Sequence, residues 1–152
     1  YYRLKEAGAS VSIVAPEAGK TYESKHGYPV VSDLASRDAR ATDFDAVLVP
    51  GGFAPDRLRR DPEVRRFVAE MNAAGKLLAA ICHGGWVLIS AKVLRGRTAT
   101  SVSAIRDDME NAGVVWLDQP VVVDGNLITA RVPADLPQFL PALLAALQRV
   151  NP

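Results

Sequence analysis

The sequence predicts an α/β domain with a mainly parallel sheet. Short apolar runs that fit buried strands alternate with segments of helical periodicity over short connections. Two of these runs, residues 46–49 and 77–81, end directly in sharp turns that contain glycine or cysteine. A chain of 152 residues has the length of one domain and can bury about 68–70% of its unfolded surface. We therefore expect a single domain over residues 1–152.

The N-terminal third predicts short elements. Residues 1–7 read as helical turns that stop at Gly8, and residues 9–15 alternate like a strand. After a turn at 16–20, residues 28–31 fit a short strand or extended edge, and the polar stretch 34–44 fits a loop or short helix. Because the first helix begins at residue 1 without a capping residue, we expect that the sequence is an N-terminally truncated domain.

The middle of the chain gives the clearest signals. Residues 46–49 form an apolar strand that ends in Pro50-Gly51-Gly52. Asp61 is a typical N-cap with proline at the first helical position, and an apolar stripe continues the helix to Gly75. Residues 77–81 follow as a strand that is apolar throughout, which is typical of a strand buried on both faces.

The C-terminal part completes the alternation of strands and helices. Residues 94–101 predict a loop leading into a short strand, 105–112 a helix that ends at Gly113, and 114–116 a strand. Asp124-Gly125 predicts a hairpin between residues 121–124 and 126–130. A final helix is expected over 136–150, with Pro141 at a first turn or kink.

Composition excludes several classes of protein. Eighteen basic and seventeen acidic residues give a net charge of +1, so nothing points to nucleic acid or an anionic membrane as a partner. No apolar run has transmembrane length. The single cysteine excludes an internal disulfide and fits a reducing cytoplasm. Two histidines and one cysteine argue against a structural zinc site, and we expect neither metal nor cofactor.

The stretch from Lys76 to Ser90 carries the chemistry. A buried strand is interrupted by Cys82 and His83, two glycines follow, and a buried helix then begins. This is the pattern of a nucleophile elbow with cysteine as the nucleophile. At the start of a helix a thiol ionises more readily, and the thiolate is the reactive form. The alternative is that Cys82 is a small buried apolar residue, but it lies at the break in the pattern beside a histidine.

The two strand-ending turns predict a shared crevice. In open α/β sheets, ligands bind beyond the C-terminal ends of the strands. Gly51-Gly52 and Cys82-His83 both lie at such ends. If the two strands are neighbours in the sheet, we expect the turns to face each other.

Four segments together resemble the ThiJ/PfpI superfamily, most strongly its PfpI-like intracellular cysteine peptidases. They are VLVPGG at 47–52, AAICHGGWVLISAKVLRGRTATS at 79–101, IRDDMENAGVVW at 105–116 and VVVDGNLITARVPADLP at 121–137. The resemblance implies a flavodoxin-like three-layer sandwich with Cys82 as nucleophile. It implies a homodimer or a ring of dimers as the assembly.

The resemblance also implies roles at the site. His83 would act as base, and Asp56 would be its acid partner, reaching the site from a neighbouring subunit. The backbone N–H groups of Gly52 and His83 would form the oxyanion hole. The alternatives are a solvated carboxylate for Asp56 and a structural role for His83. His26 is expected to be structural.

Three features depart from the family pattern. Asp56 stands where relatives usually have glutamate. The first strand and a glutamate that follows it in relatives are absent from this sequence, which supports the expected truncation. Val102 and Phe53 replace a tyrosine and a basic residue that are common in relatives, so the pocket, expected at Gly51, Phe53, Gly84 and Val102, is more apolar.

The resemblance leaves three functions open for the same sulfur. The first is a cysteine-dependent hydrolase acting on peptides, with a role in stress protection. The second is glyoxalase III-like or deglycase-like chemistry on methylglyoxal or its adducts, hence on a small carbonyl substrate. The third is a non-enzymatic redox sensor or chaperone, in which Cys82 is oxidised to sulfenic or sulfinic acid.

Overall fold

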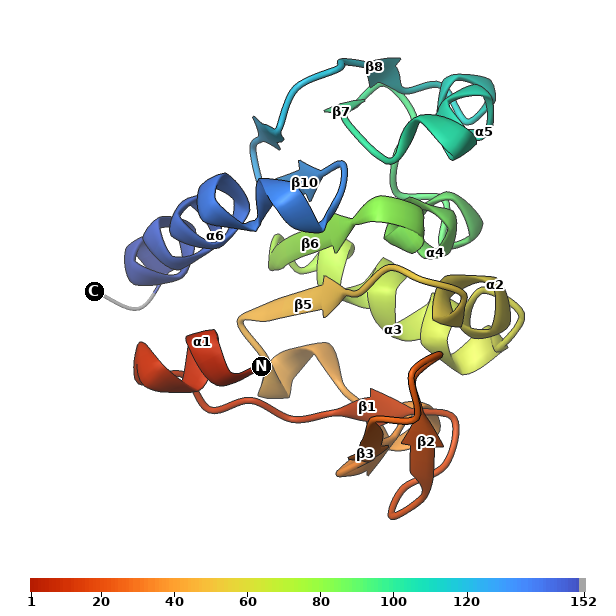
Figure 1. The fold of residues 1–152 in the computed structure, drawn as a ribbon, viewed down its shortest axis with the longest axis vertical. Coiled ribbons are helices and arrows are strands. Elements are labelled where there is room, and N and C mark those ends of the chain that lie inside the picture. The colour runs from red at the N-terminus through yellow and green to blue at the C-terminus, as the bar shows by residue number, and fades with distance from the viewer. Residues whose placement is uncertain (151–152) are drawn as a thin grey trace.

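The centre of the computed structural model, which describes residues 1–150, is a four-stranded sheet in the order β5–β6–β10–β9 (Figure 1). Strands β5 (Ala46–Val49), β6 (Leu77–Ile81) and β10 (Leu127–Ala130) run parallel, and β9 (Val121–Asp124) pairs antiparallel with β10. The mainly parallel sheet and the Asp-Gly hairpin are thus confirmed. Positions 151–152 of the predicted domain lie outside the described residues.

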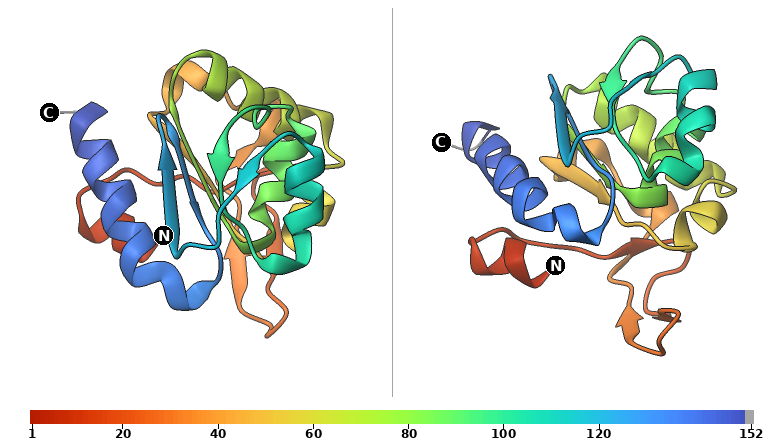
Figure 2. Two further views of the ribbon diagram at one scale, coloured as in Figure 1. Left: turned by 90° about the horizontal axis from the view of Figure 1, so that it is seen from above. Right: turned by 45° about the horizontal axis from the view of Figure 1, so that its top comes forward.

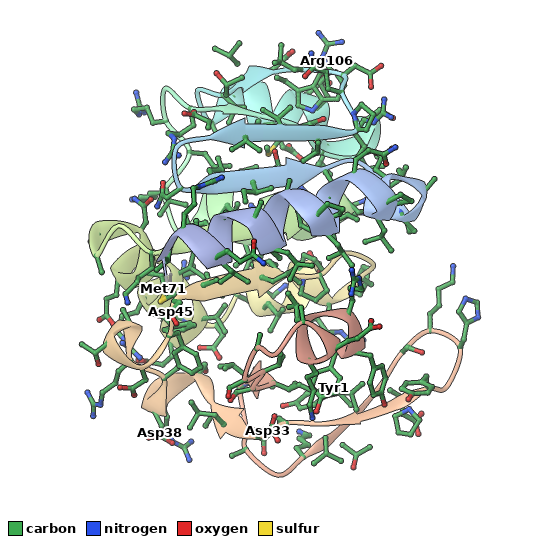
Figure 3. The ribbon with its side chains drawn as sticks, turned by 90° about the vertical axis from the view of Figure 1, so that its left-hand side faces the viewer. Tyr1, Asp33, Asp38, Asp45, Met71 and Arg106 are labelled. Carbon is green, nitrogen blue, oxygen red and sulfur yellow. The ribbon has the colours of Figure 1, made fainter. Side chains whose placement is uncertain are left out.

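The two faces of β6 enter two separate hydrophobic clusters. On one face, Leu77, Ala79 and Ile81 pack with Phe139 and Leu143 of α6 (Leu136–Val150). On the other face, the alternate residues of β6 pack with α3 (Pro62–Ala73) and α4 (Gly85–Ser90). Figure 2 shows the sheet between these helical layers, and Figure 3 shows α6 lying across the sheet. The three-layer, flavodoxin-like sandwich is therefore confirmed.

The helix α3 begins and ends as its sequence predicts. The Asp61 carboxylate accepts a hydrogen bond from the Glu63 N–H at 2.8 Å and so satisfies an end group of the helix. Phe67, Val68 and Met71 are buried on its apolar stripe. The helix covers β5 and β6 and fixes the layer from which the elbow emerges.

The N-terminal strands are shorter than predicted. A helix, α1 (Tyr2–Glu6), is present, but β1 covers only Val14–Ala15 and pairs parallel with β4 (Leu34–Ala35), separately from the central sheet. The prediction of a strand over residues 9–13 was wrong. At Ile13 the backbone N–H donates to the Asp33 carboxylate at 2.7 Å, so a side chain takes the place of a strand partner.

A small hairpin projects from this end of the molecule. It joins β2 (Thr21–Glu23), which the sequence analysis missed, to β3 (Pro29–Val31), which it predicted (Figure 1). The stretch 34–44 contains two 3-10 turns, in agreement with a loop or short helix, together with the unpredicted β4.

The remaining elements lie at the opposite end of the sheet. Strand β7 (Thr98–Ala99) pairs parallel with β8 (Val115–Trp116), and α5 (Arg106–Asn111) connects them. Arg106 marks that end in Figure 3, far from Asp38 at the other. Pro141 lies within α6, six residues into the helix. No helix within residues 1–150 combines the length and the apolar content needed to cross a membrane.

Candidate active site

The turns that follow β5 and β6 meet at one edge of the sheet. The strands are hydrogen-bonded neighbours, with Val49 paired to Ala80, so their C-terminal ends lie side by side (Figure 1). A Cβ placed on Gly51 would lie 2.7 Å from the Cβ of Cys82 and 3.4 Å from its Sγ. The two turns therefore touch, as predicted, and only glycine fits at position 51 without displacing the cysteine.

The elbow holds Cys82 in an uncommon backbone conformation. Its φ angle is +61°, in the left-handed region that residues with a side chain rarely adopt. Such strain costs about 1–3 kcal/mol and persists only where the surroundings enforce it. Here a 3-10 turn, Cys82–Gly84, leads from β6 into α4. Gly84 passes so close to β5 that its Cβ would lie 2.6 Å from the Val49 carbonyl oxygen. The strand–turn–helix elbow is confirmed.

The sulfur and the imidazole lie next to each other. Cys82 Sγ is 3.3 Å from His83 Nδ1, and both residues are half-buried. At this distance the thiol proton can pass to the ring nitrogen, and the resulting imidazolium can donate to the thiolate. One chain thus brings a thiol and an imidazole together at the elbow, and their roles as nucleophile and base stay a prediction.

The His83 ring has an aromatic neighbour that the sequence analysis missed. The rings of His83 and Trp86 are 5.0 Å apart, with 59° between their planes. The indole N–H donates to the Asp108 carboxylate at 2.8 Å. The Arg59 guanidinium carbon lies 5.5 Å from the centre of the Trp86 ring. The spacing of three residues between His83 and Trp86 was the available signal, because it places both side chains on the same face of a helical turn.

Asp56 lies on α2 (Ala54–Leu58), a helix that the sequence analysis did not predict. Its carboxylate accepts a hydrogen bond from Arg60 at 2.6 Å. Within residues 1–150 no hydrogen bond or ion pair joins Asp56 to His83. The single chain therefore does not bring the expected acid to the histidine, and its action from a second subunit stays a prediction.

The loop between β5 and α2 presents other expected site groups. Gly52 has a φ of +74°, and its N–H has no hydrogen-bond acceptor within the described residues. This N–H is therefore available to an acceptor, and its part in an oxyanion hole stays a prediction. Phe53 is 66% exposed, with the Arg57 guanidinium carbon 5.7 Å from its ring centre. His26 lies exposed in the turn of the β2–β3 hairpin.

A cavity of about 270 Å³ opens where β7, β8 and β10 end, and neither Cys82 nor His83 is among its lining residues. Val102, a predicted pocket residue, lines it, and the Val102 N–H lies 3.5 Å from the Cys82 carbonyl oxygen. The other lining residues were missed: Ser101, Ser103, Trp116, Asp118, Arg131 and Val132. They follow or end β7, β8 and β10, so the rule that ligands bind at strand ends was the signal.

Arg131, one of the residues that line the cavity, binds two carboxylates. The Arg131 guanidinium donates to both carboxylate oxygens of Asp135, at 2.9 and 3.0 Å, and to Asp118 at 2.8 Å. These hydrogen bonds from Arg131 lower the pKa of Asp135, which is 6% exposed. Within residues 1–150 no three His, Cys, Asp or Glu side chains are grouped so as to hold a metal ion.

Comparisons with known proteins find a matching family model and similar relatives. The family model described as "DJ-1/PfpI family" matches residues 1–146. "Deglycase PH1704" of Pyrococcus horikoshii is 51% identical, over 90% of this chain and 81% of the relative. "General stress protein 18" of Bacillus subtilis is 44% identical, over 96% and 86%. "Putative cysteine protease YraA" of the same organism is 45% identical, over 89% and 80%.

A solved structure shows the same fold at high similarity. It is a two-domain protein of Anabaena variabilis with DJ-1/ThiJ/PfpI-like and ferritin-like domains. Its TM-score is 0.94 with 47% sequence identity, and the match covers 96% of this chain and 42% of that chain.

Proposed function

The chain belongs to the DJ-1/PfpI family, and from that premise we propose that it is a cysteine-dependent hydrolase of the deglycase type. Its substrates would be adducts between amines and a small dicarbonyl compound such as methylglyoxal. The observation that carries the proposal is the Cys82 sulfur at the elbow, 3.3 Å from a histidine nitrogen. Two of the relatives compared above bear the names deglycase and putative cysteine protease, which supports an enzymatic role.

The proposed reaction needs one nucleophile and one base. His83 takes the thiol proton, and the thiolate bonds to the carbinol carbon of the adduct while the C–N bond breaks. The amine leaves with the proton from His83. In the hemithioacetal that remains, a proton shift through an enediol oxidises the carbinol carbon and reduces the neighbouring ketone. Water then hydrolyses the lactoyl thioester, releasing lactate and the thiol, so adduct and water give amine and lactate without an external oxidant.

Two features of the region around the elbow support this chemistry. The Gly52 N–H has no acceptor within residues 1–150, and it lies in the loop that touches Cys82, so it is suited to receive a developing oxyanion. The cavity of about 270 Å³ is small and carries both apolar groups and hydroxyl groups. A dicarbonyl-derived group fits such a space better than a long peptide does.

Peptide hydrolysis is the second candidate, and the name of the YraA relative favours it. The sequence resemblance ranked it first. It would require the acid of a triad, but Asp56 is bound to Arg60 within its own chain. Peptidase activity therefore depends on a homodimer or ring of dimers that brings a second copy's Asp56 to His83. The relative named as a general stress protein supports a setting of stress protection for either activity.

The test compares three reactions in the same protein. The first assay measures the release of amine and lactate from a methylglyoxal adduct of N-acetyl-lysine. The second measures lactate formed from free methylglyoxal, and the third measures cleavage of a fluorogenic peptide. Each assay is run on the parent protein, on Cys82→Ala, and on His26→Gln as a matched control. We expect adduct turnover that Cys82→Ala abolishes and His26→Gln retains. Peptide cleavage alone would favour the second candidate. Turnover of free methylglyoxal alone would make the chain a glyoxalase, and no turnover with ready Cys82 oxidation by peroxide would make it a redox sensor.

A further inference from the structure

The aromatic contact beside the nucleophile has a role that the proposed reaction does not yet use. We propose that Trp86 is a positioning residue that holds the His83 imidazole toward the Cys82 sulfur, and that Asp108 fixes Trp86. The inference rests on the proposed function, because it assumes that the Cys82–His83 pair does the chemistry. It names two side chains that act through His83 and touch no substrate.

The geometry of His83 requires such a support. Its Nδ1 faces Cys82 Sγ at 3.3 Å, which only a narrow range of ring orientations permits. The residue is only half-buried, so burial by itself does not hold the ring in one orientation. The Trp86 indole lies against it at 5.0 Å with a tilt of 59°, a separation typical of paired aromatic rings. A ring held on one side by an indole keeps its nitrogen directed at the sulfur.

Trp86 is itself held from two helices. Asp108 on α5 accepts the indole N–H at 2.8 Å. Arg59, directly after α2, places its guanidinium carbon 5.5 Å from the indole centre, and its Nε donates to Ser90 at 2.9 Å. On α3, Arg66 pairs with Glu63 and Glu70 of the same helix. One anion and one cation therefore contact the indole, and both limit its rotation.

Close packing of α4 on α5 makes the link between Trp86 and Asp108 possible. A Cβ on Gly85 would lie 2.9 Å from the Met109 sulfur and 3.3 Å from Ile105 Cδ1. The absence of that Cβ lets the two helices approach. Trp86, the next residue, then reaches the carboxylate one residue before Met109. The position of α5 is thus transmitted through Trp86 to the catalytic pair.

A purely structural role for Trp86 is the competing explanation. Trp86 packs against the larger hydrophobic cluster, so Trp86→Ala would lower stability under either explanation. Asp108 is exposed and its loss does not open the core. Variants at Asp108 therefore separate orientation of the histidine from packing of the core.

The first measurement is the NMR signal of the His83 ring protons in a His26→Gln background, where one imidazole remains. The indole ring current displaces these signals. We expect Asp108→Ala to move them toward their positions in Trp86→Leu, and Asp108→Asn, which retains an acceptor oxygen, to keep them near the parent positions. Asp107→Ala is the matched control on the same helix. Unchanged signals in Asp108→Ala would overturn the proposal.

The second measurement is the rate of Cys82 alkylation by iodoacetamide at neutral pH. Loss of one hydrogen bond predicts a fall of about threefold to tenfold in Asp108→Ala. Removal of a nearby negative charge would by itself raise the rate, so the expected direction is opposite to a charge effect. In a His83→Gln background Asp108→Ala should have no further effect. An equal fall there would overturn the proposal. Neither readout requires turnover, so failure of the proposed function remains distinguishable.

Discussion

The two turns at the active edge of the sheet are built in opposite ways. The Cys82 turn after β6 is enclosed, and Gly84 approaches the β5 backbone so closely that no side chain fits. The turn after β5 leads to α2, where Phe53 is two-thirds exposed and Asp56 is tied to Arg60, whose side chain is 72% exposed. Surface ion pairs of this kind contribute little to stability. The contact between Cys82 and His83 is therefore set within one chain, whereas the role proposed for Asp56 depends on a second copy that approaches the surface.

The largest effect is expected from Gly84→Ala, which attacks the enclosed turn. The added Cβ would lie 2.6 Å from the Val49 carbonyl oxygen, a backbone atom that cannot turn away. We expect a loss of roughly 1–3 kcal/mol of unfolding free energy in urea titrations, together with loss of Cys82 alkylation. Gly85→Ala is the matched control for the unfolding free energy alone, because its Cβ would meet the flexible Met109 sulfur at 2.9 Å and no backbone atom at such a distance. Equal losses in both variants would contradict the comparison.

Gly51→Ala tests the contact between the two turns. Its Cβ would lie 2.7 Å from the Cβ of Cys82, so the sulfur must move. Displacement of a reacting atom by about 1 Å can cost 100-fold in rate, and we expect adduct turnover to fall far more than stability. In a Cys82→Gly background the same substitution should cost less unfolding free energy, because the clash with Cys82 is absent. If Gly51→Ala lowers the unfolding free energy equally in both backgrounds, the two turns are not in steric contact at Cys82.

A third strand end, after β10, carries a partly buried ion pair, which makes the stability of the protein depend on pH. Hydrogen bonds from Arg131 lower the pKa of Asp135 below its value in the unfolded chain, about 3.9. This stabilisation is fully present above about pH 4 and is lost as the pH falls through the folded-state pKa. We expect Asp135→Asn to lower the melting temperature by several degrees at pH 7, with the difference narrowing below about pH 4.

Asp118→Asn is the control for that experiment, because Asp118 also binds Arg131 but is 70% exposed. Its effect on the melting temperature should be smaller at every pH. A difference for Asp135→Asn that persists unchanged in acid would exclude the ion pair as its cause.

The smallest effect on stability is expected at the exposed turn. Asp56→Ala and Arg60→Ala remove the same surface ion pair, so each should change the unfolding free energy by less than about 0.5 kcal/mol. If Asp56 acts on His83 of a second copy, only Asp56→Ala should lower peptide cleavage, and it should do so in the assembled form. Equal peptide cleavage by the two variants would show that Asp56 has no catalytic role. The difference between the enclosed and the exposed turn would then have no bearing on activity.

Local patterns predicted the centre of the fold and the elbow at Cys82. The apolar run 77–81 is buried at every position, the Asp61 cap starts α3, and Asp124-Gly125 turns the β9–β10 hairpin. These features depend on neighbours in the sequence. Strands β2 and β4 were missed because two or three residues hold no readable period, and α2 because its five residues lack an apolar stripe.

The sequence by itself determined which sulfur and which base lie together, because Cys82 and His83 are adjacent and follow a buried strand. Only the tertiary structure decided what surrounds them. The contact of Gly51 with Cys82, the cavity lined by three distant chain segments, and the hydrogen bond between Trp86 and Asp108 all join residues far apart in the chain. Such contacts depend on how strands pair and how layers pack, and a local pattern of residue types does not encode that packing.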